Sequence, residues 1–302
     1  MIALMFPGQG AQEVGMGLAL AEAYPTARAA FDEANEALGY DLAAICFTGP
    51  AEALVPTDVC QPAILATSVA AWRVATEHGL RADMVMGHSL GEYSALVAAG
   101  AIDYGQALRL VAERGAAMHA AGQERPGTMA ALLGQSDGDV EALCEEAGEV
   151  WPANYNCPGQ VVASGSIDGI ERLLSITAER GIKAARLQVG GAFHSPLMAP
   201  AAERLEPALA AWDPAEPTPS FLSTTTVAIE PAERLREVLL AQLLAPVRFG
   251  HAVEHALQMG VTRFVEFGPG RVLSGLVRRV RREAETVQIG SPDDITALAE
   301  AA

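Results

Sequence analysis

The segment Asp83–Gly100, DMVMGHSLGEYSALVAAG, limits the folds open to this chain more than any other stretch. A short apolar run ends at GHSLG, residues 87–91, and helix-forming residues follow at once. A buried strand that turns sharply into a helix favours an α/β fold. A Gly-x-Ser-x-Gly sequence on such a turn is typical of a serine nucleophile, here Ser89. The alternative is an ordinary strand–helix turn that happens to contain a serine.

Short β-type runs alternate with helical stretches along the rest of the chain, as expected for an α/β protein with a parallel sheet. We expect strands at Ile2–Phe6, at Asp83–Met86 and in VTRFVEFGPG, which starts at Val261, and helices at 15–38, 62–79, 90–99 and 103–121.

The middle of the chain has a different order of elements. The pattern predicts a strand from Gly127, a helix at Asp137–Ala147, the strands VWPANYN and QVVASG, a helix at Asp168–Arg180 and a strand from Lys183. This β-α-β-β-α-β order is that of a ferredoxin-like unit. We therefore predict a small inserted subdomain at 124–191, a large α/β subdomain made of 1–123 and 192–302, and a cleft between the two.

Composition excludes several classes of function. The formal net charge of −17 makes general nucleic-acid binding unfavourable, because phosphate contacts require a basic surface. No stretch of 18 uncharged apolar residues occurs. The first residues, MIALMFPGQG, resemble a first buried strand more than a signal peptide. Four scattered cysteines then suggest reduced core residues, and we expect a cytoplasmic protein: Cys46, Cys60, Cys144 and Cys157.

One cluster of basic residues occurs in this otherwise acidic sequence. The sequence VRRVRRE near the C-terminus contains Arg278, Arg279, Arg281 and Arg282. It is either a solvated helix face or a docking patch, since a basic patch on an acidic body steers an anionic partner.

A serine nucleophile needs a base, and the histidines differ in their suitability. His88 adjoins Ser89, so its side chain should diverge from the serine. His194 lies in VGGAFHSPLM, an irregular loop at a predicted subdomain boundary, where it is well placed for a cleft. His251 and His255 are spaced as metal ligands on a helix face, but no carboxylate or cysteine motif joins them. We predict no metal site.

Arg114 falls on the apolar face of a helix, in DYGQALRLVAERGAAMHAA. The face is formed by Leu110, Val111 and Met118, which recur at helical spacing. An arginine in this position either extends its head group to solvent or meets a buried anion. A guanidinium grips a carboxylate with two parallel hydrogen bonds.

Two glycine-rich turns lack the defining features of nucleotide-binding motifs. GQGAQE and GPGRVL both lack the third glycine of the dinucleotide fingerprint, and neither has the Gly-Lys-Ser/Thr of a P-loop. Nucleotide-dependent chemistry is therefore unsupported. The first turn is better interpreted as backbone amides that complete an oxyanion hole at the end of the first strand.

Several motifs occur together in one order. They are FPGQGAQ, TDVCQPAILATSVA, GHSLGEYSAL, ERG, NYNCPGQVVASG, AFHSPLM, QLLAPVRF and EFGPGRVLSGL. This set resembles the malonyl-CoA:acyl carrier protein transacylases and the acyltransferase domains of polyketide synthases, over nearly the whole chain. The resemblance implies a hydrolase-like α/β core with a ferredoxin-like insertion, in agreement with the pattern of elements.

The resemblance also implies roles for catalytic residues. Ser89 would be the nucleophile and His194 its general base. The backbone carbonyl of Gln242 would orient the imidazole in place of a carboxylate. The backbone N–H groups of Gln9 and Leu90 would form the oxyanion hole.

Further roles concern the substrate and the partner. Arg114 would bind the free carboxylate of a malonyl group. Phe193 would crowd a 2-methyl branch, and Met118 is assigned with it to substrate selectivity. Arg278, Arg279 and Arg281 are assigned to docking of the carrier protein.

The implied activity moves a malonyl group from malonyl-CoA to Ser89 and then to the phosphopantetheine thiol of an acyl carrier protein, for fatty acid or polyketide synthesis. We expect a monomer, no cofactor beyond the substrate, and no nucleic-acid or membrane partner. One alternative is a thioesterase that clears acyl groups from carrier proteins with the same Ser89 and His194. Another is a non-enzymatic interaction subunit.

Overall fold

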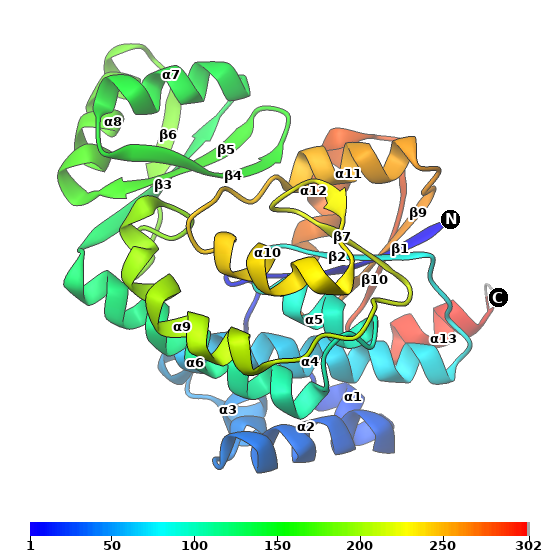
Figure 1. Ribbon diagram of the computed structural model, residues 1–302. Coiled ribbons are helices and arrows are strands. Elements are labelled where there is room, and N and C mark those ends of the chain that lie inside the picture. Colours follow the sequence, from blue (N-terminus) through cyan, green and yellow to red (C-terminus); the bar gives the residue numbers. More distant parts are fainter. Residues whose placement is uncertain (301–302) are drawn as a thin grey trace.

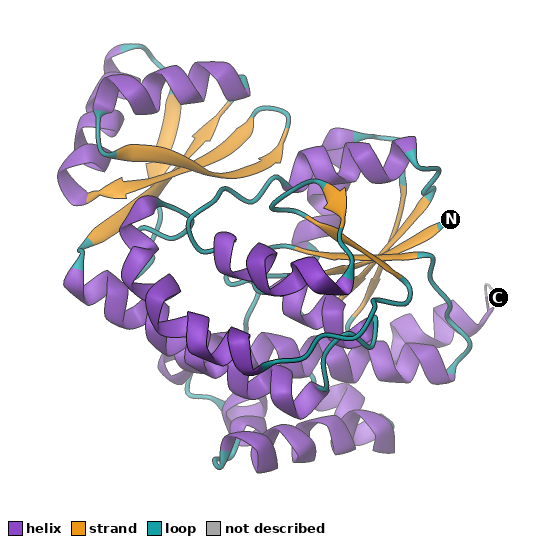
Figure 2. Cartoon of the chain, in the orientation of Figure 1, coloured by secondary structure: helices purple, strands orange, loops and turns teal. Residues whose placement is uncertain are grey.

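The computed structural model describes residues 1–300, which form two separate sheets (Figures 1 and 2). The larger sheet has the strand order β10-β9-β1-β2-β7-β8. Its first five strands pair in parallel, and β8 runs antiparallel to β7. The strands are β1 (Ile2–Phe6), β2 (Met84–Gly87), β7 (Ser220–Ser223), β8 (Ala228–Ile229), β9 (Arg263–Phe267) and β10 (Glu285–Ile289).

Helices cover both faces of this sheet, which explains why its neighbouring strands β1 and β2 are continuous apolar runs. Successive side chains of β1 point to opposite faces. Leu4 and Phe6 belong to the core that includes α4 (Thr57–Glu77) and α5 (Gly91–Ala98). Ala3 and Met5 belong to the core under α11 (Phe249–Gln258) and α12 (Val272–Val280).

The remaining helices of this part complete the large subdomain, several of them by packing on other helices. They are α1 (Leu18–Ala23), α2 (Pro25–Leu38), α3 (Leu42–Thr48), α6 (Tyr104–Glu124), α9 (Ala199–Ala211), α10 (Leu235–Ala241) and α13 (Pro292–Glu300), with short 3-10 turns at η1 (Ala51–Leu54), η2 (Pro196–Met198) and η3 (Ala232–Arg234). Within residues 1–300, no helix is both long enough and apolar enough to cross a membrane.

Two predicted helices differ from the observed ones. The predicted helix 15–38 is two helices, because Tyr24 is extended and Pro25 starts the second one. The predicted helix 62–79 begins earlier, at Thr57, so that Pro62 lies inside α4. A proline there removes one helical hydrogen bond, and the extensive burial of this helix compensates for the loss.

The smaller sheet lies inside the range 124–191 and has the order β4-β5-β3-β6, with each neighbouring pair antiparallel. Its elements are β3 (Gly127–Leu133), α7 (Asp137–Ala147), β4 (Val150–Cys157), β5 (Gln160–Ser166), α8 (Ile167–Glu179) and β6 (Lys183–Arg186). The two helices pack on one face through Val140, Leu143, Ile170 and Leu173. This arrangement confirms the predicted fold class; the exact limits of the subdomain stay a prediction.

Direct contacts hold the small sheet against the large subdomain (Figure 1). The edge of β4 forms a bridge in which the N–H of Tyr155 donates to the carbonyl of Val247 at 2.8 Å, and the N–H of Val247 donates to Ala153 at 2.8 Å. Val247 follows α10 closely in the sequence. This backbone pairing forms the seam between the two subdomains, and it places the small subdomain next to the loops that follow β1 and β2.

Candidate active site

Ser89 occupies the sharp turn between β2 and α5. Its φ of 52° lies in the left-handed region, which a residue with a side chain adopts at a cost. A Cβ added to Gly87 would overlap the backbone of Gly91 and Glu92, and a Cβ on Gly91 would overlap the carbonyl of Phe6. Both glycines of the motif are therefore required by close backbone contacts. The serine is held in a strained conformation that presents its hydroxyl.

His194 reaches this hydroxyl from the loop between β6 and η2. Its Nε2 lies 2.8 Å from Ser89 Oγ. On the other side of the ring, Nδ1 lies 2.8 Å from the backbone carbonyl of Gln242, at the end of α10. Because a carbonyl only accepts, Nδ1 carries the proton and Nε2 is free to accept one. His194 also has a positive φ, 58°, so both members of the pair are strained.

The pKa of His194 is far below that of a free histidine. Burial is the larger cause and the positive charge of Arg114 acts in the same direction, and together they lower the pKa to about 3. The imidazole is therefore neutral near pH 7, which is the form that a general base requires. His88 hydrogen-bonds to Asn156 at 2.9 Å rather than to Ser89, so it diverges from the serine as expected.

The two backbone amides assigned to the oxyanion hole lie at the same cavity. Gln9 follows β1, and Leu90 is the N-cap residue of α5. Among the described residues, neither N–H donates a hydrogen bond to a protein group. Unpaired N–H groups beside the serine are suited to a developing negative charge.

Arg114 is buried, with 1% of its surface exposed, so the solvent-directed alternative is wrong. Its Nη1 donates to Gln61 Oε1 at 2.7 Å, and its Nη2 donates to Ser89 Oγ at 3.1 Å and to Gln242 Oε1 at 2.9 Å. Its Nε has no partner, and no carboxylate in residues 1–298, the range whose side chains are described, forms an ion pair with it.

This environment is unfavourable for a cation on its own. Burial lowers the pKa of Arg114, although an arginine keeps its charge in proteins. Buried charges in proteins are normally paired with an opposite charge. The missing anion would therefore bind beside the nucleophile, where the guanidinium already contacts Ser89.

A cavity of about 130 Å³ is lined by Ser89, His194, Arg114 and the two oxyanion-hole residues. Met118 and Phe193, the two residues assigned to selectivity, line it as well. Sequence reasoning assigned no role to five other lining residues, although two of them lie in the quoted motifs TDVCQPAILATSVA and NYNCPGQVVASG. The five are Gln61, Met129, Asn154, Leu187 and Val189. A second cavity, of about 230 Å³, shares four residues with the first and extends to α12: Gln9, His88, Asn154 and Leu187.

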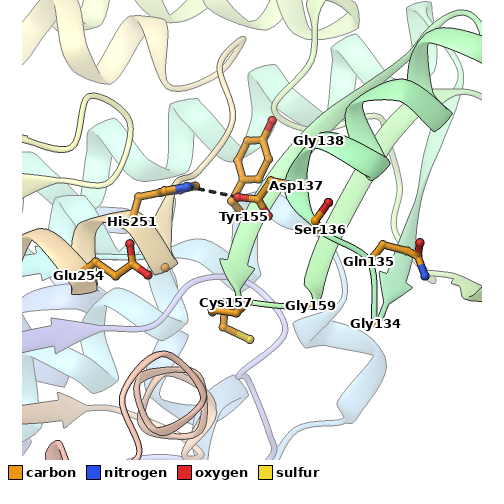
Figure 3. Close-up of a pocket in the computed structure, with 12 residues that line it drawn as sticks. Gly134, Gln135, Ser136, Asp137, Gly138, Tyr155, Cys157, Gly159, His251 and Glu254 are labelled. Atoms are coloured by element: carbon orange, nitrogen blue, oxygen red, sulfur yellow. Dashed lines mark ion pairs between the residues drawn. The ribbon is translucent and has the colours of Figure 1, made fainter.

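A larger cavity, of about 610 Å³, lies elsewhere, between the start of α7, the β4–β5 hairpin and α11 (Figure 3). Figure 3 shows His251 directed toward Asp137, and their Nε2 and Oδ2 atoms are 3.2 Å apart. Tyr155, from the wall of the same cavity, donates to Glu141 at 2.7 Å. The described residues contain no group of three potential metal ligands, and His255 does not line this cavity.

The arginine cluster lies at the end of α12 and just after it. Arg278, Arg279, Arg281 and Arg282 are exposed. Arg279 is not a free surface charge, because its Nη1 donates to Gln160 Oε1 on β5 at 2.6 Å. Part of its role is thus to connect the two subdomains. Docking by this cluster stays a prediction.

Comparisons with known proteins agree with this arrangement. Residues 4–291 match the family model described as acyl transferase domain. The malonyl CoA-acyl carrier protein transacylase of Bacillus subtilis (strain 168) is 44% identical, over 97% of this chain and 95% of its own length. The protein of the same name from Escherichia coli (strain K12) is 42% identical, over 99% and 98% of the two chains.

The fold is shared with solved structures as well. A malonyl-transacylase solved in complex with its type II polyketide synthase acyl-carrier protein superimposes with a TM-score of 0.96 at 40% identity, over 100% of this chain and 99% of that one. Full-length similarity at this level, together with the site geometry, places the chain in the acyl transferase family, among the malonyl CoA-acyl carrier protein transacylases.

Proposed function

We propose that this protein transfers a malonyl group from malonyl-CoA, through an ester on Ser89, to the phosphopantetheine thiol of an acyl carrier protein. The observation that carries the proposal is Arg114, a buried cation without a carboxylate partner among the side chains of residues 1–298, at 3.1 Å from the nucleophile. A simple acyl group has no anionic group to pair with the Arg114 guanidinium, whereas the free carboxylate of a malonyl group supplies the missing anion.

In the first half-reaction, His194 Nε2 accepts the proton of Ser89 Oγ as the oxygen attacks the thioester carbonyl. The N–H groups of Gln9 and Leu90 stabilise the resulting oxyanion, an interaction worth roughly 3–4 kcal/mol per donor in comparable sites. The C–S bond then breaks, and the CoA sulfur leaves with the proton from His194. The malonyl group remains as an ester on Ser89.

The second half-reaction reverses these roles with a different thiol. His194 accepts the proton of the phosphopantetheine thiol, and the sulfur attacks the ester carbonyl. The carbonyl–Oγ bond breaks, and His194 returns the proton to Ser89. Because the first product leaves before the second substrate reacts, the kinetics are ping-pong.

The backbone carbonyl of Gln242 serves in place of the carboxylate of a Ser-His-Asp triad. At 2.8 Å from Nδ1, it holds the tautomer that leaves Nε2 as the acceptor. A neutral carbonyl stabilises the imidazolium less than an aspartate does. The charge on Arg114 also opposes that imidazolium, which is consistent with a weakly basic His194.

The second cavity provides a route for the phosphopantetheine arm. It leads from Gln9 and His88 to the start of α12, where Val272 is 51% exposed. The arginine cluster lies at the other end of the same helix. A carrier protein whose acidic surface meets Arg278, Arg279 and Arg281 could therefore insert its arm along this route.

Several properties complete the proposal. The protein acts as a monomer in the cytoplasm without a cofactor, and its product serves fatty acid or polyketide synthesis. Phe193 and Met118 restrict the space beside the acyl group, which favours malonyl over a 2-methyl homologue by roughly 1–3 kcal/mol.

The transferase and the thioesterase hypotheses differ in the fate of the acyl group. The protein is incubated with malonyl-CoA, with and without a phosphopantetheinylated carrier protein, and each protein is analysed by intact-mass spectrometry. We expect a malonyl adduct on Ser89 that passes to the carrier protein, and no adduct on a Ser89→Ala variant. Rapid release of malonate that the carrier protein does not divert would support the thioesterase instead.

A further inference from the structure

Glu92 is a buried acid that the mechanism above does not use. It lies in the first turn of α5 and is 0% exposed. Its Oε1 accepts hydrogen bonds from Ser223 Oγ at 3.0 Å and from the N–H of Thr224 at 2.6 Å, and Thr224 Oγ1 lies 2.9 Å away. Its Oε2 accepts from Gln242 Nε2 at 2.6 Å. One oxygen therefore faces the loop after β7, and the other faces the active site.

The contact between Glu92 and Gln242 helps to fix the orientation of the Gln242 side-chain amide. Both ends of a glutamine amide have the same size, so the neighbouring donors and acceptors select its orientation. Gln242 Oε1 accepts from Arg114, while Gln242 Nε2 donates to Glu92 and, at 3.0 Å, to the carbonyl of Ser89. If the amide were reversed, a donor would face the guanidinium and an acceptor would face two acceptors.

Gln242 contacts both functional groups of the site. Its backbone carbonyl accepts from His194 Nδ1 at 2.8 Å, and its side-chain oxygen accepts from Arg114 Nη2 at 2.9 Å. The residue is fully buried, with 0% exposure. The position of this one residue therefore affects the general base through its backbone and the arginine through its side chain.

We infer that Glu92 is a positioning residue, which acts through Gln242 to hold both His194 and Arg114 in place. This inference rests on the proposed function, because it assigns Arg114 to the acyl carboxylate. Glu92 does not line the cavity at Ser89, and the described hydrogen bonds of Ser89 Oγ go to His194 and Arg114 instead. Burial raises the pKa of Glu92, but its Oε2 accepts the hydrogen bond from Gln242 in either charge state.

A purely structural role for Glu92 makes a different prediction. In that case the carboxylate only connects α5 to the loop after β7, and its loss would lower stability without changing substrate preference. The two roles are separable because the hydrogen bonds to Ser223 and to Gln242 use different oxygens.

The test is Glu92→Gln, which preserves shape but replaces one acceptor by a donor. Whichever way the new amide turns, its NH₂ group faces either the Gln242 amide nitrogen or the N–H of Thr224. Self-acylation of Ser89 is measured with malonyl-CoA and with acetyl-CoA. We expect both rates to fall, and the malonyl-to-acetyl ratio to fall by about 10–100-fold, the range for one hydrogen bond to a charged group.

Ser223→Ala is the matched control, since it removes a hydrogen bond to the same carboxylate on the side away from Gln242. It should lower the melting temperature and leave the ratio unchanged. An amide that turns its oxygen toward Gln242 would keep the contact, whereas the shorter acid of Glu92→Asp cannot span it. A malonyl-to-acetyl ratio that is unchanged in both Glu92→Gln and Glu92→Asp would overturn the inference. Malonyl loading by the parent protein is measured first, so a failure of the proposed function is distinguished from a failure of the inference.

A double-mutant cycle provides a second measurement if Glu92→Gln folds poorly. Gln242→Leu removes the amide but keeps the backbone carbonyl, and Glu92→Asp shortens the acid so that it cannot span the same contact. Because the proposed effect passes through the Gln242 amide, Glu92→Asp should lower the ratio in the parent and not in the Gln242→Leu background. Equal effects in both backgrounds would contradict the inference.

Discussion

A comparison of two cavities in this protein shows that size does not identify the functional site. The cavity between α7 and α11 has a volume of about 610 Å³, and the one at Ser89 has about 130 Å³. In the larger cavity, the side chains of His251 and Asp137 contact each other (Figure 3). In the smaller cavity, Arg114 has no carboxylate partner among the described side chains, those of residues 1–298.

The two cavities differ in how far their ionisable side chains are exposed to water. The side chains of His251 and Asp137 are 45% and 38% exposed, so water weakens the electrostatic interaction between them. Arg114 is shielded from water, and its charge has a large effect on any anion that enters. The smaller site is therefore the one organised for a charged substrate.

The largest expected effect is that of Arg114→Ala on malonyl selectivity. Loss of a buried, charge-assisted contact should reduce malonyl loading by at least ~100-fold, and acetyl loading should fall much less or rise. Loading rates are measured by intact mass with each acyl-CoA. Arg109→Ala, an exposed arginine on the same helix, is the control. Equal loss for both acyl groups would refute the carboxylate contact.

The pH dependence of acylation tests the effect of the Arg114 charge on the pKa of His194, the general base. Because the pKa of His194 is lowered to about 3, the imidazole is neutral at pH 5.5 and the rate should not follow a titration near 6.5. Removal of Arg114 takes away a positive charge that lowers this pKa. The acid limb of Arg114→Ala, measured with acetyl-CoA, should therefore move to higher pH. A parent enzyme that loses half its rate near pH 6.5 would be inconsistent with this geometry.

A smaller effect is expected at the arginine cluster. Arg278→Glu should slow transfer to the carrier protein by roughly 3–10-fold, more at low salt, because charges at the rim of an interface mainly change the association rate. Self-acylation from malonyl-CoA should not change. Arg278 is preferred to Arg279, whose hydrogen bond to Gln160 gives it an internal role. If both half-reactions slow equally, docking at this cluster is wrong.

The smallest effect is expected in the larger cavity. His251→Ala removes the ion pair with Asp137, and a partly exposed pair contributes about 0–1 kcal/mol to the free energy of unfolding. Chemical denaturation should detect at most this loss, and malonyl loading should be unaffected. A marked loss of loading would assign a functional role to the seam between the subdomains.

Features that depend on neighbours in the sequence could be predicted. The elbow at Ser89 follows from an apolar run, two glycines and a helix-forming segment. The ferredoxin-like unit follows from the order of six local patterns. Pro62 shows the limit of such reasoning, because the burial of α4 outweighs a local signal for a helix start.

The hydrogen-bond network of the site could not be predicted, because it depends on contacts between segments that are distant in the sequence. The burial of Arg114 requires α4, α5 and the end of α10 to meet around it. Neither Glu92 nor the side chain of Gln242 carries a local signal, since a glutamate in the first turn of a helix is ordinarily a favourable exposed charge. Their roles became visible only through their hydrogen bonds.

The central claim is that Arg114 binds the free carboxylate of the acyl group. A crystal structure of the malonyl ester on Ser89, trapped without carrier protein, tests it most directly. We predict both carboxylate oxygens at about 2.7–2.9 Å from nitrogen atoms of the guanidinium, as in charge-assisted pairs. A carboxylate directed to solvent, with Arg114 bonded only to Gln61 and Gln242, would contradict the claim.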